Sequence, residues 1–161
     1  MPSHSKIDTY RDARSRIAAL LAEANDSVAA MSGVAAVLFE AMPDVSWVGF
    51  YRVVGVDLLR VGPYQGPVGC QEIAFGKGVC GVAAASGSAQ VVPDVHAFPG
   101  HIACDAGSRS EIVVPVFDPQ GRVAAVLDLD SHSAARFDDD DRLELEKVAG
   151  GLAGFFADDH P

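Results

Sequence analysis

Two apolar segments separated by only four residues place the strongest constraint on what this chain can fold into. Residues 111–117 and 122–129 are rich in β-branched side chains, and the turn sequence Asp-Pro-Gln-Gly joins them at residues 118–121. A connection this short predicts a hairpin, in which the two strands are antiparallel. The fold must therefore contain an antiparallel sheet.

The remaining pattern adds helices and further strands around this hairpin. Apolar residues at helical spacing predict helices over residues 8–24, from Asn25 or Asp26 to about Met42, and after the acidic run 138–141. Further strands are predicted at residues 46–54, 58–61, 70–75 and 91–92, and a short helix at 79–86. The short connections predict an α+β class, with a mainly antiparallel central sheet and helices packed on one side. One domain spans residues 1–161, with residues 1–7 expected to be a flexible N-terminal tail.

Charge and hydropathy exclude several classes of function. The chain has 12 lysines and arginines against 22 acidic residues, a formal net charge of -10. It has no basic stripe, so nucleic acid is not an expected partner. No apolar run reaches the roughly 20 residues that a bilayer requires, so no membrane partner is expected either. The first residues lack the apolar region of a signal peptide. We therefore expect a cytoplasmic protein, whose acidic surface favours cationic ligands where the acids converge.

Three cysteines, Cys70, Cys80 and Cys104, are an odd number in a chain without an export signal. A structural disulfide framework is expected to use an even number in an oxidising compartment. The spacing C-x9-C-x23-C contains no close pair of the kind found in structural zinc sites, so no metal is expected. The alternatives are a zinc site built from Cys104, histidines 96 and 101 and another cysteine, and buried cysteines that act as small hydrophobes.

The surroundings of two cysteines favour reactive thiols. Cys104 lies in a long irregular segment, residues 93–110, and loops of this length tend to be functional. Nearby His101 and Arg109 are expected to favour its thiolate. Cys80 falls in the first turn of the short predicted helix, where unpaired N–H groups are also expected to favour a thiolate.

Acidic and aromatic side chains are predicted to share one face of the sheet. Asp128 and Asp130 alternate with apolar leucines, so both carboxylates project from the same face, and their repulsion should raise at least one pKa. Glu111 opens the preceding strand and can join them. Trp47 and Tyr51, four residues apart on one strand, also face one side and suit a thioether ligand. The alternatives are a solvated strand end for the acids and plain core for the aromatic residues.

These segments together resemble a known family. SWVGFY, GPYQG, FGKGVCG, VPDVHAFPGHIACD, SEIVVPV and AVLDLDS, in this order, are similar to the free methionine-R-sulfoxide reductases, which have the GAF fold. The likeness runs from about Leu20 to the final helix. The departures are Pro67-Val68-Gly69 before Cys70, and Tyr64 where phenylalanine is common.

The resemblance implies a role for each candidate residue. It makes Cys104 the nucleophile and Cys80 the main resolving cysteine, and Cys70 a third cysteine that can also form a disulfide with Cys104. Glu111, Asp128 and Asp130 become substrate-binding carboxylates, and Trp47 and Tyr51 line the pocket. No cofactor is bound; the resemblance implies a homodimer and a thioredoxin-like external dithiol. The rival hypotheses are a non-catalytic GAF sensor of a small molecule, against which we expect no attached effector domain, and a thiol peroxidase.

Overall fold

The computed structural model describes residues 4–102, 104 and 106–157, and its centre is one antiparallel sheet. Within these residues the sheet has the strand order β3-β2-β1-β6-β5-β4, and all neighbouring strands are antiparallel. The strands are β1 (Trp47–Val53), β2 (Leu58–Gln65), β3 (Glu72–Ala74), β4 (Gln90–Val92), β5 (Ser110–Phe117) and β6 (Val123–Ser131). The α+β class, the antiparallel sheet and the predicted hairpin, here β5 and β6, are confirmed.

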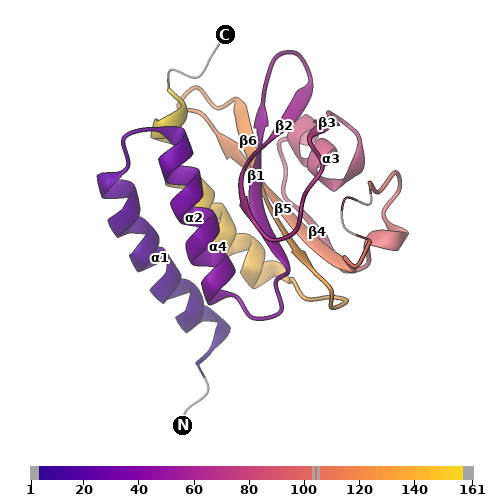
Figure 1. Ribbon diagram of the computed structural model, residues 1–161, viewed down its shortest axis with the longest axis horizontal. Helices are drawn as coiled ribbons and strands as arrows, with labels where there is room; N and C mark the ends of the chain where they lie inside the picture. Colours follow the sequence, from indigo (N-terminus) through magenta and orange to yellow (C-terminus); the bar gives the residue numbers. More distant parts are fainter. Residues whose placement is uncertain (1–3, 103, 105, 158–161) are drawn as a thin grey trace.

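Helices cover both faces of the sheet (Figure 1). The long helices α1 (Lys6–Glu23), α2 (Ser27–Ala41) and α4 (Asp139–Gly150) lie on one face, where their apolar side chains form the larger core with β1, β5 and β6. The short helix α3 (Gly78–Ser86) packs on the other face with a second, smaller core. The prediction of helices on one side therefore holds for the long helices and not for α3. Short 3-10 turns follow at Val95–Ala97 and Ala153–Phe156.

Several elements differ in extent from their prediction; β3, for example, is shorter than the predicted strand 70–75 and does not include Cys70. The first helix begins at Lys6, inside the predicted flexible tail, because Ser5 and Asp8 form a capping box at its N-terminus. Strand β2 continues through Gly62 and Pro63, which were expected to end it. Two residues of β2 oppose one residue of β1 at this point, and such a bulge accommodates a proline that cannot donate a ladder hydrogen bond. None of the described helices is long and apolar enough to cross a bilayer.

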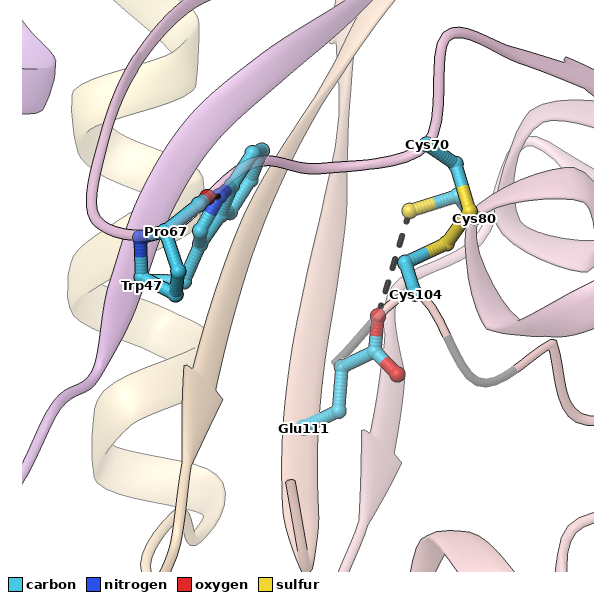
Figure 2. Close-up of a disulfide and its surroundings, with 6 residues drawn as sticks. All are labelled: Trp47, Pro67, Cys70, Cys80, Cys104 and Glu111. Carbon is cyan, nitrogen blue, oxygen red and sulfur yellow. Dashed lines mark hydrogen bonds between the residues drawn. A yellow bond between two sulfur atoms is a disulfide. The ribbon is translucent and has the colours of Figure 1, made fainter. Parts of the chain in front are cut away.

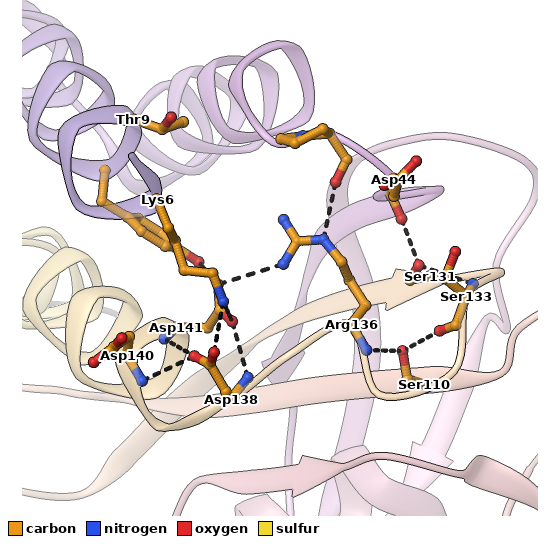
Figure 3. Close-up of polar contacts among 12 residues, drawn as sticks. Lys6, Thr9, Asp44, Ser110, Ser131, Ser133, Arg136, Asp138, Asp140 and Asp141 are labelled. Atoms are coloured by element: carbon orange, nitrogen blue, oxygen red, sulfur yellow. Dashed lines mark hydrogen bonds and ion pairs between the residues drawn. The ribbon is translucent and has the colours of Figure 1, made fainter. Parts of the chain in front are cut away.

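A buried polar network holds the N-terminal helix to the last one (Figure 3). The Asp141 carboxylate is fully buried and accepts hydrogen bonds from the Tyr10 hydroxyl at 2.7 Å and the Lys6 ammonium at 2.8 Å. The Lys6 ammonium also donates to Asp138, the N-cap residue of α4, at 2.8 Å. The guanidinium of Arg136 lies 3.6 Å from Asp141. The acidic run 138–141 was predicted to begin α4, and Asp138 and Asp141 of this run also anchor α1.

Replacing Asp141 with alanine should destabilise the fold strongly. The substitution leaves the Tyr10 hydroxyl without its acceptor and removes a buried partner of Lys6, at a cost of about 3 kcal/mol in the free energy of unfolding. Urea denaturation of Asp141→Ala measures this cost. The neighbouring exposed Asp140→Ala is the matched control and should change stability by less than about 0.5 kcal/mol. Equal stability of the two variants would contradict the assigned role of the network.

Candidate active site

Strand register brings the predicted acidic and aromatic residues together. Trp47 of β1 lies opposite Asp130 of β6, and Asp130 lies opposite Glu111 of β5. Asp128 occupies the next position of β6 on the same face, opposite Gly49. Leu127 and Leu129, which alternate with the aspartates, belong to the core under the long helices. The predicted alternation is therefore confirmed, and it directs these side chains to the face that carries α3.

A small pocket lies on this face. Its lining includes seven of the eight residues singled out in the sequence: Trp47, Tyr51, Cys80, Cys104, Glu111, Asp128 and Asp130. The eighth, Cys70, is bonded to Cys104. The cavity encloses about 40 Å³, whereas ligand sites usually enclose about 300–1,000 Å³. With the disulfide formed, the pocket has room for water-sized molecules and not for an amino acid.

The indole of Trp47 forms one wall of the pocket. It is stacked between Tyr51 and Tyr64, with ring centroids 5.8 and 5.1 Å away, and its Nε1 donates a hydrogen bond to the Pro67 carbonyl oxygen at 2.9 Å. A side chain at Gly49 would overlap Tyr64 and come within 2.7 Å of the indole. The indole ring therefore packs closely against Gly49, a strand position that has no side chain.

Burial dominates the electrostatics of the acids. Asp128 and Glu111 are only 4 and 7 % exposed. Burial raises the pKa of Asp128 well above its usual range, and the charge of Asp130 raises it further. The pKa of Glu111 is also raised well above its usual range, first by burial and then by the charge of Asp128 and a hydrogen bond with it. The predicted repulsion is confirmed, although it is a smaller cause than burial.

The three cysteines occupy two different states (Figure 2). Cys70 and Cys104 form a disulfide, with their Cα atoms 5.2 Å apart, and both residues are half-buried. Cys80 is free and buried, and its thiol donates a hydrogen bond to Glu111 Oε1 at 3.9 Å. This Cys70–Cys104 pairing is the one that the family resemblance implied for Cys70, the third cysteine.

Two expectations about thiol activation are not met. Cys80 does lie in the first turn of α3, but burial and the charges of Asp128, Glu111 and Asp130 raise the pKa of its thiol, so the helix N-terminus does not make it a thiolate. His101 lines the pocket, yet burial and the nearby His96 lower its pKa. A neutral imidazole supplies no positive charge to stabilise a Cys104 thiolate.

Ser108 is a pocket residue that the sequence did not reveal. It is 5 % exposed, and its hydroxyl has no hydrogen-bond partner although it lines the pocket. Backbone hydrogen bonds of Arg109 to Val95 and Ser131 fix the chain beside it. A serine in a polar loop carries no sequence signal for such burial. Oδ1 of Asp128 is likewise buried and unpartnered, and buried polar atoms of this kind require an explanation.

Gly49→Ala tests the wall of the pocket. The added methyl group collides with Tyr64 and the Trp47 ring, so we expect a loss of about 1–3 kcal/mol in the free energy of unfolding. Because Trp47 is the single tryptophan, its emission spectrum should shift in the folded variant. Gly150→Ala is the control, since nothing lies within 4 Å of its added methyl. An unchanged emission spectrum and unchanged stability in Gly49→Ala would contradict the packing described.

Comparisons with known proteins agree with this fold. The GAF domain family model matches residues 16–154. The free methionine-R-sulfoxide reductase of Escherichia coli (strain K12) is 40 % identical over 148 residues, covering 92 % of this chain and 88 % of the relative. The X-ray structure of free methionine-R-sulfoxide reductase from Neisseria meningitidis, in complex with its substrate, has a TM-score of 0.92 and 46 % identity, covering 98 % of this chain and 94 % of that one.

A similar structure also carries a different description. A putative GAF sensor protein from Burkholderia vietnamiensis matches with a TM-score of 0.89 and 44 % identity, over 94 % of this chain and 95 % of that chain. The name sensor therefore occurs among proteins as similar as the named reductases. On fold and sequence, this chain belongs to the GAF-domain family and, within it, to the group that contains the free methionine-R-sulfoxide reductases.

Proposed function

We propose that this protein reduces the R epimer of free methionine sulfoxide to methionine, with Cys104 as the nucleophile. The observation that carries the proposal is the position of Cys104, which lines a buried acidic pocket and is disulfide-bonded to Cys70. In a reductase that oxidises its own thiol, condensation of the sulfenic acid with a second thiol gives such a disulfide. The named relatives from Escherichia coli and Neisseria meningitidis support the substrate.

The pocket offers a complementary group for each part of the substrate. Asp128 and Asp130 bind the ammonium, which neutralises carboxylates that are costly to bury. Trp47 and Tyr51 contact the methylthio end. The unpartnered hydroxyl of Ser108 is available to hydrogen-bond the substrate's carboxylate. A methionine inside a protein has an amide in place of the ammonium, so the pocket favours the free amino acid.

Glu111 is the proton donor in this proposal. Its raised pKa favours the protonated carboxyl, which a proton donor requires, and its Oε1 lies 3.9 Å from the Cys80 sulfur. Sulfoxide oxygen is a poor leaving group, so a general acid here accelerates the reaction about 10²–10⁴-fold.

The sulfur chemistry proceeds in three balanced steps. The Cys104 thiolate attacks the sulfoxide sulfur, the S–O bond breaks, and the oxygen passes to Cys104 with a proton, which leaves methionine and a sulfenic acid. A second cysteine thiol then displaces water and forms a disulfide. An external dithiol reduces that disulfide by exchange and is itself oxidised. Cys70 fits the second role by its bond to Cys104; Cys80, which lines the same pocket, stays the predicted main resolving cysteine.

The exposure of the disulfide supports an external reductant. Cys70 and Cys104 are half-buried, whereas Cys80 is only 3 % exposed. The neighbouring Val68 and Ile102 are exposed apolar side chains at the pocket. We infer that a thioredoxin-like protein docks here, that the protein acts as a homodimer, and that it works in the cytoplasm, where dithiols are kept reduced. Reduction also frees the two segments that close the pocket, and substrate can then enter.

Separate assays of the two sulfoxide epimers with the Cys104→Ser variant test the proposal. The wild-type protein with dithiothreitol should consume the R epimer only, measured as methionine by chromatography, and Cys104→Ser should form none. Cys80→Ser and Cys70→Ser serve as matched thiol controls, and each should complete a first turnover on reduced protein. Retained activity in Cys104→Ser would overturn the assignment, and an inactive folded wild type would favour the sensor.

Substitutions of two acids should separate proton donation from substrate binding. Glu111→Gln should lower kcat about 10²–10⁴-fold with a small change in KM. Asp130→Asn should instead raise KM by about tenfold or more, because a hydrogen bond to a charged group is lost. Steady-state kinetics on free methionine-R-sulfoxide measure both, and the reverse pattern would contradict the assigned roles.

The same Glu111→Gln variant should be more stable than the wild type above neutral pH. Folding raises the pKa of Glu111, so its contribution to stability is present below the unfolded value near 4.3 and is lost as pH rises through the folded value. A neutral glutamine avoids this loss. Thermal unfolding should give a higher Tm for the variant at pH 8 and a smaller difference at pH 4. A lower Tm at pH 8 would show that the carboxylate stabilises the fold.

A further inference from the structure

Three potential metal ligands meet at the bottom of the pocket, from three separate elements. They are the Cys80 thiol of α3 and carboxylate oxygens of Glu111 on β5 and Asp128 on β6, and these atoms all lie within 4.8 Å of one another. All three residues are buried. Figure 2 shows the Cys80 sulfur and the Glu111 carboxyl directed toward each other. A thiolate with two carboxylates is a donor set that borderline divalent ions accept.

A second observation, an unsatisfied oxygen within this hydrogen-bonded cluster, points to a cation. Asp128 is 4 % exposed, and its Oδ1 has no hydrogen-bond partner. Asp130 adds negative charge beside it, and no lysine or arginine is among the described residues that line the pocket. An unpartnered carboxylate oxygen with this burial is stable only when it is protonated or when a cation binds to it. The net charge of -10 favours cations over the whole surface as well.

We infer that Cys80, Glu111 and Asp128 form a binding site for a divalent transition-metal ion of the zinc type. Ligand bonds of about 2.0–2.3 Å in a tetrahedral site place the donor atoms roughly 3.5 Å apart. The Cys80–Glu111 distance is 3.9 Å and all three donor atoms lie within 4.8 Å of one another, so the donors need to close by about 1.3 Å at most. Binding releases the protons held by the thiol and the carboxyl groups, and the affinity therefore rises with pH. Open space in the pocket leaves the fourth position to water.

The site gives the pocket a metal-sensitive state. This consequence rests on the proposed function: a bound metal occupies Asp128, one of the two acids that bind the substrate's ammonium, together with the proton donor Glu111, and it holds Cys80 as a metal thiolate. The ion is then a competitive inhibitor, which raises the apparent KM for methionine sulfoxide without changing kcat. An ammonium ligand needs only the carboxylates, so the contribution of the Cys80 sulfur distinguishes metal binding from substrate binding.

Cobalt absorption spectroscopy on a protein with one thiol tests metal binding without any assay of activity. In Cys70→Ser/Cys104→Ser, the thiol left is that of Cys80. Titration with Co²⁺, without added thiol, should give a saturable thiolate-to-cobalt charge-transfer band at one ion per chain, which Zn²⁺ abolishes by displacement. Adding Cys80→Ser should remove the band. Glu111→Gln and Asp128→Asn should each weaken binding by at least about tenfold, while exposed Glu23→Gln should not change it.

The absence of the band in folded protein would overturn the metal site. If the double variant does not fold, the oxidised wild type repeats the test, because Cys80 is the free cysteine beside the Cys70–Cys104 disulfide. Single-turnover assays of reduced protein, with Zn²⁺ and without excess dithiol, then test the inhibition. A cobalt band in a protein that reduces no sulfoxide would support the metal site and refute the proposed function. Sulfoxide reduction by a protein that gives no cobalt band would support the proposed function and refute the metal site.

Discussion

The burial of negatively charged groups on one face of the sheet is the constraint on which the rest of this molecule depends. Glu111 and Asp128 are almost fully buried, and Asp130 lies beside them on the same face. Burial raises the pKa of both buried carboxyl groups, because their ionised forms are energetically unfavourable away from water. The rest of the fold must hold these groups in place, because carboxyl groups are better solvated by water than by the protein interior. A cationic ligand relieves this cost, and that gives the pocket its selectivity.

The sheet supports one side of the pocket, and a disulfide closes the other side. The two cores and the Lys6–Asp141 network fix the sheet that presents the acids and Trp47. The segments that carry Cys70 and Cys104 lie over them, and the disulfide ties these segments together. The cavity of about 40 Å³ is the result. In the proposed cycle, redox state and access to the pocket are coupled through this one covalent bond.

The sequence was sufficient to predict those parts of the site that follow from strand periodicity. Alternation along two strands is enough to group Asp128 with Asp130 and Trp47 with Tyr51, and the short hairpin turn brings Glu111 beside them. The pairing of Cys70 with Cys104 depends on two irregular segments that have no such periodicity. The raised pKa of Cys80 and the burial of Ser108 also required the tertiary structure, because acids and loops from other elements cause them. The side on which α3 packs is likewise a tertiary property.

The most direct test of the central claim replaces the ammonium of the substrate with an amide. Free methionine-R-sulfoxide and its N-acetyl derivative are given to the reduced protein under identical conditions, and the reduced product is measured by chromatography. If the buried acids recognise the ammonium, kcat/KM should be lower for the N-acetyl compound by about 10²-fold or more. The amide leaves the desolvated carboxylates without a cationic partner. Equal kcat/KM values for the two compounds would contradict the account.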